Sequence, residues 1–222
     1  QWDSSYWADF LKKNKIKLPE GETDVATYAE NLRNVVELSF PSAYFLHRVV
    51  NNDAAEKTIG LFATVAPLLG KNPVIIPDNN SPADYDWSGI NEADKKRMEA
   101  GIATLLPLAN TYRGLGIGTL MNTAGAKPAE IQKTIESRFA SLQTFYTNNP
   151  AVNLMSADFT GSSSDNSSDK WNWDNIPAGD KVHVKRQMAS AQRAFIMGSN
   201  YETGNLLMKK GYDTARSITT LQ

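Results

Sequence analysis

The stretch that decides the fold is PAEIQKTIESRFASLQTFY, residues Pro128 to Tyr146. Its apolar side chains recur every three or four residues, the period of an amphipathic helix with one buried face. They are Ile131, Ile135, Phe139, Leu142 and Phe145. Pro128 suits the first helical position, because its missing N–H needs no partner there. The sequence therefore predicts a long helix that starts at Pro128 and buries this face.

The same period extends along the rest of the chain. It predicts helices within 22–40, 41–51, 54–69, 91–112 and from about residue 182 onward. Thr23 or Asp24 can cap the first of these, and Pro41 suits the first turn of the second. No segment alternates apolar and polar residues as a good strand would. The predicted class is all-α, with repeated helical hairpins forming one or two packed lobes.

Two irregular segments divide the chain. Proline, asparagine and aspartate gather around 77–90, which is typical of a connection. We predict an N-terminal helical lobe over 1–76, a linker over 77–90 and a C-terminal helical lobe over 91–222. A Ser/Asn-rich loop over 159–175 contains Trp171 and Trp173. These tryptophans are candidates for contact with a sugar or protein partner, although pinning the loop to the body is the plainer interpretation.

Composition narrows the functional classes. A formal net charge of −1 gives no general attraction to nucleic acid or anionic membranes. The absence of cysteine excludes disulfides and thiolate chemistry. His47 and His183 lie far apart in sequence without a metal-ligand pattern around them, so we expect no metal site and no cofactor. The first residues lack the apolar run of a signal peptide or membrane span.

The stretch LANTYRGLGIG, residues 108–118, raises a catalytic alternative. An ADP-ribosyltransferase needs an arginine on the NAD phosphate, a Ser/Thr-rich strand and a glutamate that stabilises an oxocarbenium-like transition state. Arg113, Ser162–Ser164 and Glu202 occur in that order. The final motif of that family resembles Glu-x-Glu or Gln-x-Glu before an apolar strand, whereas Asn205 stands here. The missing strands also count against this alternative.

An internal repeat gives the arginine a structural interpretation. LANTYRGL at 108–115 aligns with MASAQRAF at 188–195, and LMNTAGAKPA aligns with LLMKKGYDTA further on. Arg113 then pairs with Arg193, Gly125 with Gly211 and Ala129 with Ala215, within repeats of about 105–131 and 185–218. The glycines suit left-handed helix ends, and the alanines suit close helix crossings. A catalytic arginine would not be expected to have such a counterpart.

The segment Ser199 to Glu202 matches a capping box. In that motif Ser199 would cap the next helix, and Glu202 would reach back to the cap. This role accounts for Glu202 without catalysis.

Three segments resemble the large A component of bacterial toxin complexes, the Tc toxins. LPEGETDVATYAENLRNVVELSFPSAYFLHRV, from Leu18 to Val49, is similar to a recurring segment with a Pro/Gly entry and a Phe-Pro-[Thr/Ser] step. VKRQMASAQRAFIMGSNYETGNLLMKKGYDTARSITTL, from Val184 to Leu221, is similar to a Gln-Arg-x-Phe unit of that family. LANTYRGLGIGTLMNTAGAKPAEI resembles a degenerate copy with Tyr112 in place of the glutamine.

The resemblance implies a non-catalytic piece of the helical shell around a translocation channel. The implied partners are the remainder of a larger toxin subunit, its pentamer and a host-cell receptor or glycan. Nucleic acid is not among them, and the membrane is reached only through the full assembly. The implied localisation is secreted or cell-surface associated. A domain excised from such an assembly would expose an apolar face.

Overall fold

The structure, a computed structural model, describes residues 3–50, 54–69, 72, 85–123, 125, 127–159 and 171–212. Within these residues the regular structure is helical, and a β-type pairing occurs only as an isolated bridge between Leu69 and Asn72. The all-α prediction is therefore confirmed. The helices are α1 (Ser4–Lys13), α2 (Val25–Ser39), α3 (Pro41–Val50), α4 (Ala54–Val65), α5 (Glu92–Thr111), α6 (Ile117–Met121), α7 (Pro128–Asn148), α8 (Ala178–Gly198) and α9 (Tyr201–Lys209), with 3-10 turns η1 (Ala66–Leu68) and η2 (Arg113–Leu115).

The sequence analysis did not predict α1. Its N-cap is Asp3, whose carboxylate accepts a hydrogen bond of 2.8 Å from the backbone N–H of Tyr6. Only Leu11 of this helix is buried, while Tyr6 and Phe10 are more than a third exposed. The apolar residues of α1 therefore do not form a fully buried stripe.

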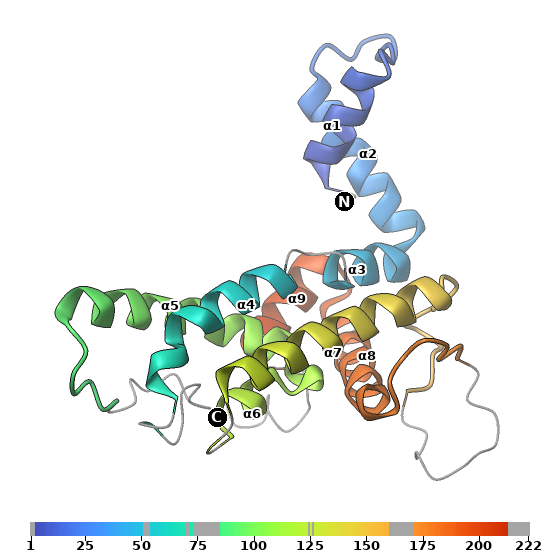
Figure 1. Cartoon of the computed structure of the whole chain (residues 1–222). Coiled ribbons are helices and arrows are strands. Elements are labelled where there is room, and N and C mark those ends of the chain that lie inside the picture. Colours follow the sequence, from blue (N-terminus) through green and yellow to red (C-terminus); the bar gives the residue numbers. More distant parts are fainter. Residues whose placement is uncertain are drawn as a thin grey trace, which may run out of the picture.

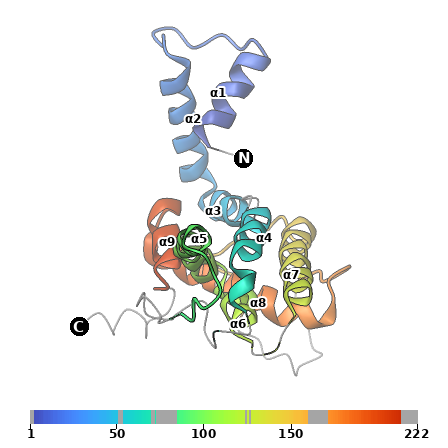
Figure 2. The ribbon, with the colours of Figure 1, turned by 60° about the vertical axis from the view of Figure 1, so that its left-hand side comes forward.

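A hairpin and a body make up the molecule. Helices α1 and α2 lie antiparallel and project from the remaining helices, as both ribbon views show (Figures 1 and 2). Helix α3 lies at the junction, where the chain turns from the hairpin into the body (Figure 1). In the body α4 packs on α5, α8 packs on α7 and α9, and η2 lies against α8.

One buried apolar cluster fills the body. The predicted face of α7 is part of it, and all five of its residues are buried: Ile131, Ile135, Phe139, Leu142 and Phe145. The cluster extends from Phe45 of α3 to Met208 of α9. The hydroxyl of Tyr112, after α5, donates a buried hydrogen bond of 2.8 Å to the carbonyl of Val49 in α3. Helices before and after the predicted linker at 77–90 thus share one core.

Candidate functional site

The glycine-rich stretch that raised the catalytic alternative forms a tight connection between α5 and α6. Tyr112, which precedes η2, and Leu115, the last residue of η2, are both buried. Gly114 approaches α8 so closely that an added Cβ would lie 2.2 Å from the backbone nitrogen of Gln187. Gly116 has a φ of 69°, the left-handed region that glycine enters without strain. Each of these residues has a packing role.

A buried polar network supports this connection from α7 and α8. Arg138 donates a hydrogen bond of 2.6 Å to the carbonyl of Leu115. Ser137 and Ser141 both donate to Oδ2 of Asp180, at 2.7 and 2.9 Å. These two hydrogen bonds join α7 to the first turn of α8 through one carboxylate oxygen.

Burial also shapes the titration of two groups in this network. It lowers the pKa of Arg138, against the opposing effect of Asp180. It lowers the pKa of His183 too, and the positive charge of Arg138 acts in the same direction. The neutral form of His183 is therefore the one that this environment favours.

The two arginines of the predicted repeat lie in different local structures. Arg113 is an exposed residue of η2, whereas Arg193 is an exposed residue inside α8. Arg113 lies in η2 and not in α5, which ends at Thr111. Arg113 instead packs against Gly211, where an added Cβ would lie 2.5 Å from its Nη2.

The glycine and alanine positions of the two predicted repeats also differ in local structure. Gly211 has a φ of 75°, and its N–H and that of Tyr212 donate to the carbonyls of Met208 and Leu207. This is the pattern of a glycine-closed helix end, as predicted. Gly125 has the same φ, but α6 already ends at Met121, so Gly125 does not close that helix. Ala129 is exposed, which contradicts a close helix crossing there, and Ala215 lies outside the described residues.

The N-cap of α9 lies one residue after the predicted one. Asn200 is the N-cap of α9, and its side chain accepts a hydrogen bond of 2.9 Å from the N–H of Thr203. Ser199 instead ends α8 with a φ of 60°, so its predicted capping role is wrong. Glu202 is exposed in the first turn of α9, where the helix dipole favours a carboxylate.

Trp171 and Trp173 pack on α7 and on the end of the segment that follows it. Trp171 stacks on Phe159 with ring centroids 5.2 Å apart, and Trp173 lies 4.6 Å from Phe145. Both tryptophans are half-buried, which matches the pinning interpretation. Ser162–Ser164, named for the catalytic alternative, lie outside the described residues.

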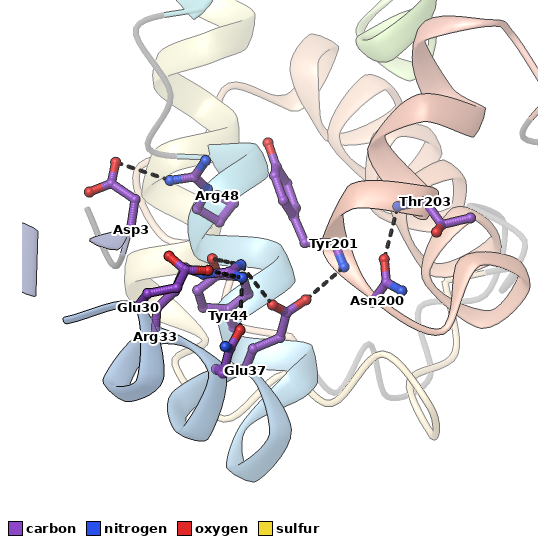
Figure 3. A network of polar contacts seen from close by, with 10 residues as sticks. Asp3, Glu30, Arg33, Glu37, Tyr44, Arg48, Asn200, Tyr201 and Thr203 are labelled. Carbon is purple, nitrogen blue, oxygen red and sulfur yellow. Dashed lines mark hydrogen bonds and ion pairs between the residues drawn. The ribbon is translucent and has the colours of Figure 1, made fainter. Parts of the chain in front are cut away.

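A polar network anchors the hairpin to the body (Figure 3). Arg33 of α2 bonds to Glu30 at 2.7 Å and to Glu37 at 3.1 Å, and reaches Tyr44 of α3 at 3.4 Å. The other oxygen of Glu37 accepts a hydrogen bond of 3.0 Å from the backbone N–H of Tyr201. That N–H is one of the free donors at the start of α9, so Glu37 caps a helix from a distant part of the chain.

A second contact joins α1 to the same place. Arg48 of α3 pairs with Asp3 at 3.2 Å, and its guanidinium lies 4.9 Å from the ring centroid of Tyr201 (Figure 3). The hydrogen bond from Tyr6, with smaller contributions from Ser5 and Arg48, holds the pKa of Asp3 below its usual value. Burial raises the pKa of Tyr201.

Large apolar side chains are exposed near the end of α2, where Val35 and Leu38 belong to the helix and Phe40 follows it. Val35, Leu38 and Phe40 are 58%, 82% and 62% exposed, and we call them the α2 stripe. Earlier in the same helix, which packs on α1, Ala29 is fully buried. Exposed apolar side chains that lie close together are a candidate interaction surface.

We call the contacts of Glu37 with Tyr201 and of Arg48 with Asp3 the anchor. Sequence reasoning missed both the anchor and the α2 stripe. The spacing of Glu30, Arg33 and Glu37 is a recognisable signal for helix ion pairs. Nothing in that spacing indicates that Glu37 also reaches Tyr201. Val35 lies within the helix predicted at 22–40. The spacing of apolar residues alone does not tell which of them another helix covers.

Three comparisons give no relative for this chain. No protein-family model, curated protein or solved structure matches it. In the described part of the chain no helix is long and apolar enough to cross a bilayer. Among the same residues no group of three side chains is arranged to hold a metal ion.

Proposed function

We propose that this chain is a non-catalytic helical module of a toxin-delivery subunit of the Tc A type, packed within the shell around a translocation channel. The observation that carries the proposal is the α2 stripe, because Leu38 is 82% exposed on a projecting hairpin. A helix from a larger assembly presents such exposed apolar side chains when its neighbours are absent.

The anchor supports this interpretation. Glu37 of α2 ties the hairpin to α9, and Arg48 of α3 pairs with Asp3 at the start of α1, so the α2 stripe has a defined orientation relative to the body. A preoriented surface loses less conformational freedom on binding. The proposed partners are the remainder of the subunit, its homo-oligomer and a host-cell receptor or glycan, in a secreted or cell-surface setting.

Photo-crosslinking tests the docking role. A photoreactive residue replaces Leu38 in the full-length natural gene product, and a matched variant carries it at the exposed Glu136 of α7. We expect crosslinks from position 38 to other helical segments of the same polypeptide or of a second copy. Crosslinking from position 38 no stronger than from position 136 would contradict the proposal.

A separate assay addresses the catalytic alternative. NAD hydrolysis and auto-ADP-ribosylation are measured for the wild type, Arg113→Ala and Arg193→Ala. We expect no turnover for any of them, because the residues around Arg113 serve packing. Turnover that disappears only in Arg113→Ala would make this stretch a catalytic motif.

A further inference from the structure

We propose that the far end of the hairpin binds the surface of an anionic lipid bilayer. This surface consists of Phe10, Lys12, Lys13, Lys15, Ile16 and Lys17, and we call it the hairpin tip. It lies where α1 turns toward α2, at the end of the hairpin farthest from the body (Figures 1 and 2). The hairpin tip is distinct from the α2 stripe, so this proposal does not depend on the proposed function.

Positive charge is concentrated at the hairpin tip. Its four lysines are all exposed, and no acidic residue occurs from Phe10 to Pro19. Asp24, further along, accepts hydrogen bonds from the N–H groups of Ala26 and Thr27, so its charge is held at the start of α2. The other flanking acidic residues are the exposed Asp9 and Glu20 and the half-buried Glu22. The positive charge is therefore confined to residues 10–19, in a chain whose formal charge is −1.

The backbone at Lys15 is a second, independent observation. Its φ is 51°, and the N–H groups of Lys15 and Ile16 donate to the carbonyls of Lys12 and Leu11. This is the same helix-ending pattern that follows α9, where the corresponding residue is Gly211. Glycine enters this conformation without strain and lysine does not. A lysine at such a position indicates that its side chain has a role that outweighs the strain.

Apolar side chains beside the lysines favour lipid over an acidic protein. Phe10 and Ile16 are 40% and 44% exposed, and the ring of Tyr6 stacks near Phe10 at 6.3 Å. A bilayer interface takes up such side chains while its headgroups bind the lysines. The N–H groups of Asn14, Lys15 and Ile16 are already bonded to carbonyls of α1, so they would not be left unpaired in the interface.

Vesicle flotation tests the proposal. The chain is mixed with vesicles of phosphatidylcholine alone, or of phosphatidylcholine with phosphatidylserine, at low and high salt. We expect binding to the phosphatidylserine vesicles alone, weakened by salt. Lys15→Gly should bind about fivefold more weakly, since each lysine near an anionic surface contributes roughly that factor. It should unfold no more easily than the wild type, because glycine relieves the strain. Lys133→Ala, which removes an exposed charge from α7, should bind like the wild type.

Three results would overturn the lipid proposal. One is equal binding to both kinds of vesicle or to neither. Another is wild-type binding by a variant in which all four tip lysines are glutamate and whose helical circular dichroism is intact. The third is binding to polyglutamate without binding to phosphatidylserine vesicles, which would assign the tip to an acidic protein. None of these results bears on crosslinking from Leu38.

Discussion

Gly114→Ala should be one of the most destabilising single-methyl changes in this chain. The added Cβ would lie 2.2 Å from the nitrogen and 2.3 Å from the Cα of Gln187, and 2.6 Å from the carbonyl carbon of Arg186. These are backbone atoms of a long helix, so they cannot rotate away as a side chain end can. Overpacking of a core typically costs about 1–3 kcal/mol, and we expect about 3 kcal/mol here.

Urea denaturation followed by circular dichroism measures the effect. Gly60→Ala is the matched control, because Gly60 lies within α4 with nothing within 4 Å of an added Cβ. It should leave the free energy of unfolding unchanged or raise it by up to about 1 kcal/mol, the helix propensity difference. If Gly114→Ala changed stability by less than about 0.5 kcal/mol, the size of an ordinary surface substitution, the close approach of η2 to α8 would be refuted.

Three further substitutions test the anchor, the histidine and the aromatic contact. Glu37→Ala should lower the free energy of unfolding by about 1–2 kcal/mol, since the N–H of Tyr201 loses its acceptor; the exposed Glu202→Ala is the control, and equal effects in urea denaturation would contradict the anchor. Burial lowers the pKa of His183 in the folded chain, so the unfolded chain binds more protons as the pH falls. The stability is therefore fully present above about pH 6.5, the ordinary pKa of histidine, and should decrease below it. His183→Gln should flatten this slope in melting temperatures measured across that range, and an unchanged slope would contradict it. Trp171→Ala should cost about 2 kcal/mol through lost stacking on Phe159, and a loss below about 0.5 kcal/mol would contradict the pinning role.

The longer helices were predictable because their period is a local property of the sequence. The long apolar face of α7 is buried as its spacing indicated. Helix ends were harder to predict. At the start of α9, for example, Ser199 and Asn200 are both residue types that cap helices well. The choice between them depends on α8 ending in a left-handed residue at Ser199, which the pattern does not contain.

The interaction surfaces were less accessible to sequence reasoning for a different reason. The contact of Glu37 with the N–H of Tyr201 joins residues 164 positions apart. Such a contact depends on how the hairpin and the body pack. The exposure of the α2 stripe likewise depends on which side chains of α2 the other helices cover. The charge of the hairpin tip, by contrast, is visible in the sequence but is hidden in a net charge near zero.

The two copies of the apparent repeat show why similar stretches adopt different structures. In LANTYRGL the helix stops after Thr111, whereas the aligned MASAQRAF continues within α8 to Gly198. The alignment places Gly114 opposite Ala194, which is fully buried with its methyl group in place. Without that methyl group the backbone at Gly114 can approach Gln187, and the chain turns there instead of continuing as a helix. The Tyr-Arg-Gly step thus places Tyr112 in the core, Arg113 beside Gly211 and Gly114 against the backbone of α8.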